Sequence, residues 1–432
     1  MSQRPLKFCM VTTFYPPYSF GGDGIFVYRL VNELAQQGHR VEVVHCVDAY
    51  RALSSKDASY GHDDEAHPNV TVHRLHSRAG ALSPFITQQT GHPGLKAKRL
   101  KEIINGGGFD VIHFHNISLI GPKALAYGTG IKLYTMHEHW LVCPMHVLWK
   151  FDRMPCSEKN CLACTIHGKR PPQLWRYTNL LDRALHHIDA FIAPSRFTWK
   201  KHLEMGLNPE VPIVCIPHFL PRPATPDSTA SDTATHPRPY CIFAGRLEKL
   251  KGVQVLIEAF RNYRACDLLI AGDGNYEAEL RRLAEGLSHV HFLGRVKYER
   301  LQALYRNAIA VMIPSVGFET FAMVNLEAFA QRAPVIVNNL GPLPEIVEES
   351  GGGLVYDGEV GLLEALDALL LDPDLRRSLG ERAHQAYLRY WTAESHLQRY
   401  FELIEGIAAE KRQTAGAPEV FFSEPAAAGW IE

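Results

Sequence analysis

The chain lacks the features that would place it in a membrane or exported class. None of its apolar runs reaches the roughly 18 residues that a membrane-spanning helix needs. The N-terminal apolar run, FCMVTTF, is too short for a signal peptide and is typical of a buried strand. We therefore expect a cytoplasmic protein.

An excess of charge of either sign is also missing. The chain has 45 Lys and Arg against 46 Asp and Glu, a net charge of −1, so nothing in its overall charge favours nucleic acid as a partner. Hydrophobic residues make up 46% and charged residues 21%, as in ordinary globular proteins. Because 432 residues are too many for one core, we expect two domains.

Two common nucleotide-binding motifs are missing as well. The chain has no GxGxxG order at its first strand–helix turn and no GxxxxGK[ST] loop, which argues against a dinucleotide site and against an NTPase. The turn instead reads YPPYSFGGDGIF, with Gly21, Gly22 and Gly24. Backbone N–H groups in such a turn could hold a phosphate or a sugar hydroxyl.

Strand-like and helix-like patterns alternate along the chain, which predicts an α/β protein with parallel sheets. Residues 221–239 are rich in Pro, Ser, Thr and Asp and read as a linker. We predict doubly wound, Rossmann-like domains at 1–220 and 240–390, facing each other across a cleft at the C-terminal ends of their strands. Residues 410–432 read as a poorly ordered tail.

The segment GFETFAMVNLEAFAQRAP carries two glutamates, Glu319 and Glu327. If a helix starts near Ala322, Glu319 lies in the loop over its N-terminus and Glu327 points inward from the second turn. A ligand could then place an anionic group on the exposed N–H groups, with hydroxyls reaching each carboxylate. The alternative is an ordinary glutamate pair on a solvated helix face.

Basic residues and glycines follow two strands of the second half. YCIFAG runs into Arg246, and Lys251 follows five residues later, an arrangement that suits a phosphate but is also found in solvated turns. DLLIAGDG ends in Gly272 and Gly274, which permit close approach of a ligand or form a turn.

Two further positions are candidates. His137 stands at the end of strand IKLYTMH, as a sugar-hydroxyl ligand, a proton relay or a satisfied core histidine. Gly341 and Glu345 are expected in a loop before a short helix, shaping a nucleotide pocket or forming a plain turn.

Four of the nine cysteines are bunched between residues 143 and 167. Cys143, Cys156, Cys161 and Cys164 follow the pattern C-x12-C-x4-C-x2-C, and in a cytosolic chain such a bunch favours metal over disulfides. We expect a structural Zn²⁺ site, with an iron–sulfur cluster or unligated thiols as alternatives. A nearby histidine could replace one sulfur; the candidates are His139, His146 and His167.

These motifs, in this order, resemble the family-4 retaining glycosyltransferases (glycosyl transferases group 1) of the GT-B fold. The resemblance covers about residues 6–409 without the linker, and it depends on YPPYSFGG, the GR…KG pair and the E-x7-E block. It implies that a last helix, residues 391–409, crosses back to an acceptor-side first domain. A subset of the family is similar in having a cysteine-bearing insertion.

The resemblance implies roles for individual residues. Arg246 and Lys251 would neutralise the diphosphate of a UDP- or GDP-linked sugar. Glu319 would bind hydroxyls of the transferred sugar, Glu327 would bind the ribose, and His137 would contact the sugar from the first domain. The N–H groups of Phe321, Ala322 and Met323 would complete the phosphate cradle, beside Gly21, Gly22, Gly24 and Gly272.

The resemblance also implies a reaction, transfer of the sugar with retention and without a catalytic metal. The acceptor would be a glycan, a lipid-linked molecule or a small molecule, with peripheral contact at the inner face of a membrane through segments such as KRPPQLWRY. Ala322 and Arg332 depart from the family pattern, because glycine is frequent at both positions. Another GT-B enzyme such as an epimerase, or a non-catalytic metal-stabilised interaction protein, are the alternatives.

Overall fold

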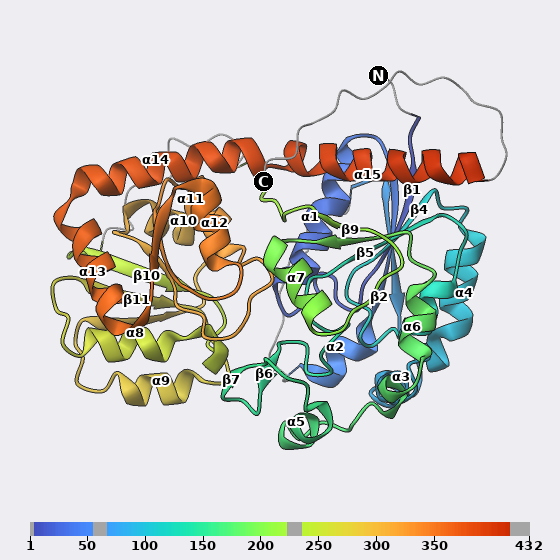
Figure 1. The fold of residues 1–432 in the computed structure, drawn as a ribbon, viewed down its shortest axis with the longest axis horizontal. Coiled ribbons are helices and arrows are strands. Elements are labelled where there is room, and N and C mark those ends of the chain that lie inside the picture. Colours follow the sequence, from blue (N-terminus) through green and yellow to red (C-terminus); the bar gives the residue numbers. More distant parts are fainter. Residues whose placement is uncertain (1–3, 55–66, 223–235, 415–432) are drawn as a thin grey trace.

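The computed structural model describes residues 4–54, 67–222 and 236–414, and it shows two α/β domains side by side (Figure 1). Each domain is built on a parallel sheet. The central strands Lys7–Val11 and Tyr240–Ala244 are apolar and almost wholly buried, as expected for parallel strands covered by helices on both faces. The predicted linker lies mostly outside the described residues.

The first sheet has seven strands in the order β3-β2-β1-β4-β5-β8-β9. Their bounds are β1 Lys7–Val11, β2 Arg40–Cys46, β3 Val70–Leu75, β4 Val111–Phe114, β5 Ile131–Thr135, β8 Ala190–Ala193 and β9 Ile213–Cys215. The helices of this domain are α1 Gly22–Gln36, α2 Val47–Leu53, α3 Leu82–Thr90, α4 Ala97–Gly106, α5 Cys161–His167, α6 Leu180–Leu185 and α7 Arg196–Glu204, with 3-10 turns η1 Gly94–Lys96, η2 Pro122–Ala126 and η3 Leu174–Tyr177. A two-stranded antiparallel hairpin, β6 Trp149–Lys150 and β7 Met154–Pro155, stands apart from the sheet.

The second sheet has six strands in the order β12-β11-β10-β13-β14-β15. Their bounds are β10 Tyr240–Ala244, β11 Asp267–Ala271, β12 Val290–Gly294, β13 Val311–Ile313, β14 Val335–Asn338 and β15 Gly353–Tyr356. The helices are η4 Lys249–Lys251, α8 Val253–Phe260, α9 Glu277–Leu283, α10 Tyr298–Asn307, α11 Val324–Ala330, α12 Leu343–Ser350, α13 Gly358–Leu371, α14 Pro373–Tyr390 and α15 Ala393–Thr414. In both sheets the strand order reverses beside the first strand of the domain, the usual place for a ligand in this architecture.

Core packing follows the strand period. Cys9 and Val11 of β1 belong to the cluster on one face of the first sheet, while Phe8 and Met10 belong to the cluster on the other. That second cluster also contains Tyr400 and four other apolar residues of α15. The last helix therefore completes the core of the first domain, along the top of Figure 1.

The crossing helix is longer than the sequence pattern predicts. It runs from Ala393 to Thr414, so the first five residues of the expected tail are helical. Lys411 fixes this end, because its Nζ lies 2.7 Å from Asp189 Oδ2 in the first domain. The rest of the predicted tail lies outside the described residues.

Candidate functional site

The domains touch each other where the predicted site residues lie. Thr320, beside Glu319, donates its hydroxyl to the backbone oxygen of His137 at 2.9 Å. Its own backbone oxygen accepts hydrogen bonds from Ser195 at 2.8 Å and from Thr198 at 3.0 Å. The loop before α11 is thus held against the first domain at the end of β5 and at the start of α7.

Glu319 is paired with Lys251, as charges in this cleft must be. Lys251 Nζ and Ser315 Oγ each lie 2.7 Å from Glu319 Oε1, and only 14% of the Glu319 side chain is exposed. Burial alone would raise the pKa of this carboxyl, but Lys251, Ser315 and Arg246 outweigh burial, so its pKa is lowered. Glu319 is therefore an ionised acceptor of hydrogen bonds and a poor proton donor.

Glu327 has the opposite environment. Burial raises its pKa, against the attraction of Arg29 on α1 and a hydrogen bond from the Tyr305 hydroxyl at 3.4 Å. The expected helix start near Ala322 is wrong by two residues, because α11 begins at Val324, and Glu327 lies in its first turn. The pair nevertheless lies as the spacing suggested, one carboxylate in the loop and one on the helix.

Ala322 and Arg332, the two positions where the family usually has glycine, both have left-handed backbone conformations. Ala322 has φ +55° and Arg332 has φ +57°, a conformation that costs a residue with a Cβ about 1–2 kcal/mol. A glycine would adopt it without that cost. The structure therefore supplies a physical reason why glycine suits both positions.

Arg246 forms an ion pair within its own loop, and the two glycines near it are required by close backbone packing. Arg246 Nη1 lies 2.7 Å from Glu248 Oε1, with about half of the arginine side chain exposed. Gly272, at φ +130°, is required because a Cβ would lie 1.9 Å from the oxygen of Gly245. A Cβ on Gly274 would lie 2.4 Å from the oxygen of Leu247. The close approach at both glycines is thus between two strand ends.

His137 lies in the middle of a chain of imidazoles. Its Nε2 is 2.9 Å from His115 Nδ1, and its Nδ1 is 3.1 Å from His218 Nε2. Burial, followed by the charge of His396, lowers the pKa of His137 to about 3, and burial also holds the pKa values of His115 and His218 well below 6.5. The first domain thus contributes neutral, hydrogen-bonded histidines.

The glycine turn begins α1. Gly21 caps the helix at φ +146°, and a Cβ on Gly21 or Gly22 would meet nothing within 4 Å, so this part of the turn is open. Gly24 differs, because a Cβ there would lie 2.2 Å from Ser19 Oγ. Packing of α1 on its own loop requires Gly24, and the open backbone is at Gly21 and Gly22.

The turn also contains Asp23, which was not among the site residues predicted from the sequence. Asp23 accepts hydrogen bonds from the Gly24 N–H at 2.8 Å and from Asn116 Nδ2 at 3.0 Å. Burial raises its pKa and so does Glu138, while Arg246 of the second domain lowers it. The available signal was an aspartate placed among the glycines of this turn.

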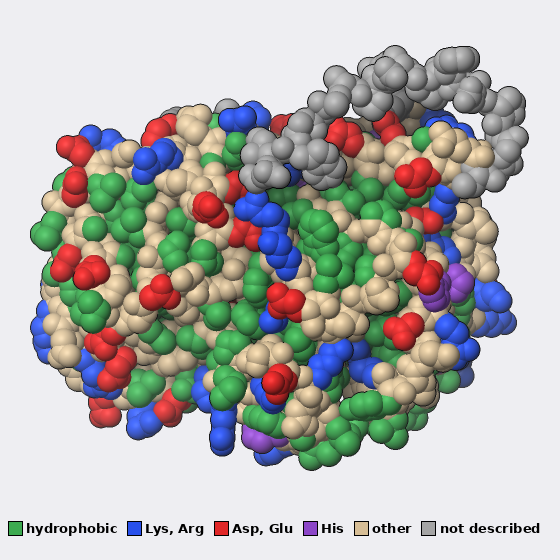
Figure 2. All heavy atoms as spheres, in the orientation of Figure 1, with side chains coloured by type: hydrophobic (Ala, Val, Ile, Leu, Met, Phe, Trp, Pro, Cys, Tyr) green, Lys and Arg blue, Asp and Glu red, His purple; other side chains and the backbone are tan. Residues whose placement is uncertain are grey.

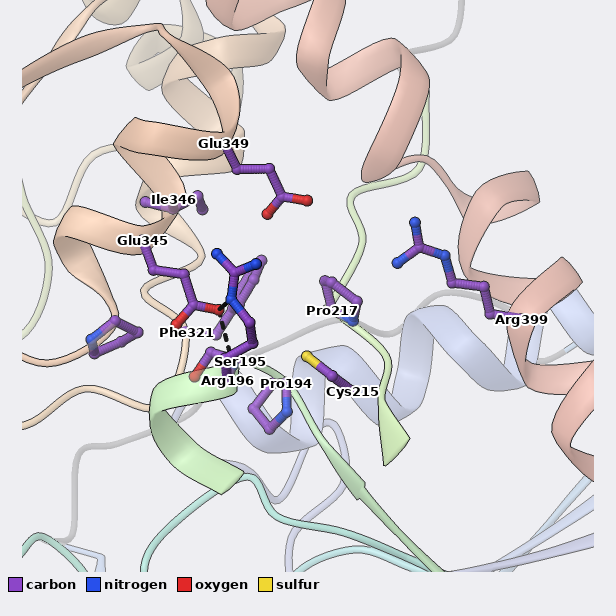
Figure 3. A pocket seen from close by; sticks show the side chains of 11 residues that line it. Pro194, Ser195, Arg196, Cys215, Pro217, Phe321, Glu345, Ile346, Glu349 and Arg399 are labelled. Carbon is purple, nitrogen blue, oxygen red and sulfur yellow. Dashed lines mark hydrogen bonds and ion pairs between the residues drawn. The ribbon is translucent and has the colours of Figure 1, made fainter. Parts of the chain in front are cut away.

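Glu345 has a role other than the predicted one. It lies within α12, and its carboxylate accepts hydrogen bonds from the N–H groups of Arg196 at 2.8 Å and Phe197 at 3.0 Å. Figure 3 shows it pointing at the start of α7 from the opposite domain, with Glu349 and Arg399 lining the same pocket. An anionic group suits a helix N-terminus, so Glu345 ties the two domains together.

One compact group of metal-ligating atoms lies away from the cleft. His236 Nε2 and His291 Nε2 lie 2.6 and 3.1 Å from Asp267 Oδ2, at the N-terminal side of the second sheet. Arg238 Nη1 is 2.9 Å from the other oxygen of this carboxylate. The arginine neutralises the carboxylate, so the group is better described as a charge-paired buried aspartate than as a metal site.

The four clustered cysteines line one small pocket. All four are free thiols. Of the alternative histidine ligands, His146 is engaged by Glu138 at 2.5 Å, and His167 packs its ring against Phe151.

Comparison with known proteins agrees with this architecture. The profile of the family Glycosyltransferase Family 4 matches residues 20–222, and that of Glycosyl transferases group 1 matches residues 227–386. The chain is 34% identical to the phosphatidyl-myo-inositol mannosyltransferase of Mycobacterium leprae, over 90% of this chain and 95% of the relative. It is 28% identical to the D-inositol 3-phosphate glycosyltransferase of Pseudarthrobacter chlorophenolicus, over 84% and 85% of the two chains.

Solved structures show the same fold. The sucrose-phosphate synthase of Thermosynechococcus elongatus superimposes with a TM-score of 0.68 at 20% identity, covering 94% of this chain and 100% of the other. Anabaena HepE in complex with UDP gives a TM-score of 0.62 at 16% identity, covering 93% and 100%. The fold is therefore GT-B, two Rossmann-like domains with a last helix that crosses back.

The family matches and the curated relatives show a nucleotide-sugar-dependent glycosyltransferase, and its fold is GT-B. Within that class, the chain belongs to glycosyltransferase family 4, and it is a hexosyl-type enzyme of this retaining family. The epimerase and the non-catalytic interaction protein, kept as alternatives on the sequence, find no support among these relatives.

Proposed function

We propose that Lys251 and Arg246 bind the diphosphate of the donor, that Glu319 binds hydroxyls of the sugar, and that Glu327 binds the ribose. The observation that carries this assignment is the Lys251–Glu319 pair, with its 2.7 Å contact and side chains that are 21% and 14% exposed. The donor is a phosphate joined to a sugar, and the pair offers one group for each part. The Lys251 ammonium would bind the phosphate, and the Glu319 carboxylate would accept hydrogen bonds from the sugar hydroxyls.

The backbone beside this pair supports the same assignment. Within the described residues, the N–H groups of Phe321, Ala322 and Met323 donate no hydrogen bond. They precede α11, where free N–H groups and the helix dipole favour an anion. Gly21 and Gly22 present open backbone from the first domain, although the Gly21 N–H already donates to Ser19 Oγ at 3.4 Å. A diphosphate between these surfaces would satisfy donors that the protein leaves free.

The reaction follows from where charge develops. When the bond from the anomeric carbon to the phosphate oxygen breaks, the sugar becomes oxocarbenium-like and negative charge grows on the diphosphate. Lys251 and Arg246 stabilise that charge at fixed positions. The lowered pKa of Glu319 keeps it ionised, so it serves as a hydroxyl ligand. The acceptor hydroxyl attacks from the face that the phosphate leaves, its proton passes to the departing phosphate oxygen, and configuration is retained.

A donor panel tests this proposal. The purified chain is incubated with UDP- and GDP-linked hexoses and candidate acceptors, and release of the nucleoside diphosphate is measured. Release from at least one donor is expected, and its loss in Glu319→Gln with retention in Glu348→Gln, an exposed glutamate on α12, would support the assignment. Equal release by both variants would contradict it.

We further propose that the acceptor is presented at a membrane surface. Exposed apolar side chains gather on the first domain around α3, η1 and η3, where Trp175 Nε1 donates to the Gln88 oxygen at 2.9 Å and joins η3 to α3. The exposed residues are Leu82, Phe85, Leu95, Leu174 and Tyr177. Figure 2 shows this hydrophobic patch at lower right with basic side chains around it.

Basic residues at the rim suit an anionic bilayer. Four basic residues next in the chain to η1 and η3 are exposed: Lys98, Arg99, Lys169 and Arg170. Among the residues that the structure describes, every helix is too short or too polar to cross a bilayer. The patch would therefore lie in the headgroup region. The acceptor named for the M. leprae relative is a phosphatidyl-inositol lipid, which fits this presentation.

Vesicle sedimentation separates this proposal from a soluble acceptor. The chain should sediment with vesicles of phosphatidylglycerol and phosphatidylcholine, less at high salt, and much less as the double variant Phe85→Ser and Leu174→Ser. Leu371→Ser is the matched control, because Leu371 is equally exposed but lies on α13 of the second domain. Binding that is unchanged in the double variant would contradict the patch.

A further inference from the structure

The segment that carries the clustered cysteines has little of its own to hold it together. It leaves the first domain after β5 and consists of two-residue strands β6 and β7 followed by the seven-residue helix α5, at the bottom of Figure 1. On α5 the side chains of Leu162 and Ile166 are 46% and 60% exposed, and only Thr165 is buried. Leu148 and Trp149 of the hairpin are buried, but α5 has no buried apolar face, and so short a helix needs another source of stability.

The backbone of the hairpin is strained. Of the seven non-glycine residues with positive φ in the described chain, four lie in this short stretch: His146, Leu148, Phe151 and Asp152. Each costs about 1–2 kcal/mol. Strain of this size persists only when the surroundings fix the conformation. The hairpin hydrogen bonds alone do not supply that.

The four cysteines come together from separate elements. Cys143 precedes β6 and Cys156 follows β7, while Cys161 and Cys164 lie one turn apart at the start of α5. They face one pocket whose other walls are largely apolar and include Met145. Four thiols around one apolar pocket are a donor set that a soft divalent ion prefers.

We propose that this pocket binds one Zn²⁺ ion through Cys143, Cys156, Cys161 and Cys164. The sulfur atoms stand further apart than a bound ion would hold them, since no three lie within 4.8 Å of one another among the described residues. Zn–S bonds of about 2.3 Å would draw them together, with loss of the thiol protons. The ion would then fix α5, which has no buried apolar face, to the hairpin.

The zinc site would act on the donor site through the hairpin. Lys249 Nζ, in the turn that ends at Lys251, donates to the backbone oxygen of Asp152 at 3.0 Å. Trp149 approaches the same region, because a Cβ on Gly317 would lie 3.5 Å from its ring. The hairpin thus braces the Lys249–Lys251 turn across the two domains. This consequence, unlike the site itself, rests on the proposed role of Lys251.

Metal analysis of the full chain tests the site. We expect about one zinc per chain in the wild type, less than a tenth of that in Cys161→Ser, and no change in Cys215→Ser, a partly buried cysteine of β9. Iron with acid-labile sulfide, disulfides among the four cysteines, or no metal would each overturn the proposal.

A second measurement needs no variant and so does not depend on folding of Cys161→Ser. Titration of the wild type with an organomercurial in the presence of a zinc indicator should release one zinc as four thiols react. Zinc release that requires none of these thiols, as shown by peptide mapping, would overturn the assignment.

Lys249→Ala tests the bracing separately. It should keep its zinc and raise the donor KM about threefold to tenfold, as expected for loss of one charged hydrogen bond. Full zinc with an unchanged donor KM would overturn the bracing. Loss of donor release in Lys251→Met is measured independently, so a failure of the donor assignment is not confused with a failure of the zinc site.

Discussion

The two domains contribute different kinds of side chain to the cleft, charged in the second domain and neutral in the first. The second domain contributes charges that are already paired, Lys251 with Glu319 and Arg246 with Glu248. The first domain contributes neutral imidazoles in a chain through His137. Fixed charge is useful where a diphosphate leaves, and neutral groups are useful where an uncharged hydroxyl arrives. The difference between the domains therefore corresponds to the two halves of the reaction.

The largest effect is expected at Lys251. Lys251→Met keeps most of the side-chain volume and removes the charge that balances the leaving diphosphate. We expect a fall of about 10²–10³-fold in kcat/KM, as for loss of one preorganised electrostatic group. The measurement is donor-dependent release of nucleoside diphosphate. Lys101→Met, on exposed α4 of the first domain, is the control and should keep full activity.

His137 tests the neutral half of the comparison. His137→Ala breaks the chain of imidazoles and leaves His115 and His218 without this partner. We expect kcat to fall about 5–150-fold, because a buried polar group left unsatisfied costs about 1–3 kcal/mol. Nucleotide affinity should change little, because Lys251 and Arg246, the charges proposed to bind the diphosphate, lie in the other domain. His137→Asn should recover part of the activity. An equal loss of nucleotide affinity in His137→Ala would break the division between the domains.

The neutral histidines also predict how stability depends on pH. The pKa of His137 is about 3 and that of His396 is about 4 in the fold, against about 6.5 in an unfolded chain. At a pH between the folded and the unfolded pKa, the unfolded chain binds more protons than the folded chain. The stabilisation from neutral histidines is therefore complete above pH 6.5, and the free energy of unfolding decreases as the pH falls toward 4. Each such histidine contributes about 1.4 kcal/mol per pH unit within its window.

Denaturant titrations between pH 7.5 and 5 measure this dependence. The slope of unfolding free energy against pH should be smaller in His396→Gln, which removes one titrating group from α15. An identical slope in the variant would show that His396 is not held neutral. Glu319 should contribute no slope in this range, because its pKa is lowered below its usual value.

The smallest effect is expected at the two left-handed residues. Ala322→Gly and Arg332→Gly each relieve a positive φ of more than 50°, with an expected gain of about 0.5–1 kcal/mol in unfolding free energy after the greater entropy of glycine is counted. Arg332 also loses its exposed pair with Glu381, which is worth little. Thermal unfolding measures both gains. Donor KM should respond only to Ala322→Gly, since Arg332 lies outside the cleft.

The fold could be predicted from the sequence because strand periods and glycine turns are local signals. The family, the fold class and the nature of the donor follow from motifs in a fixed order, and relatives confirm them. The roles of single residues remain predictions. The missed features are contacts between distant segments. Asp23 is held by Asn116, and Glu345 caps a helix of the other domain, and neither partner lies near in sequence.

At three glycines the structure adds a requirement that the sequence did not show. Gly24, Gly272 and Gly274 were predicted as ligand-binding positions, with turn chemistry as the alternative for Gly272 and Gly274, and at all three the protein's own atoms occupy the space that a Cβ would need. A glycine can be seen in the sequence, but the atoms that leave no room for a Cβ at that position are seen only in the structure. The start of α11 was misplaced because positive φ at Ala322, which no residue type there indicates, delays the helix to Val324.

Calorimetric binding of nucleoside diphosphate and of nucleotide-sugar to two variants tests the central assignment most directly. Lys251→Met should weaken both ligands about 100-fold, because both carry the diphosphate. Glu319→Gln should weaken only the nucleotide-sugar, because the free nucleotide has no sugar hydroxyls for this carboxylate. Undiminished binding of the nucleoside diphosphate by Lys251→Met would contradict the account.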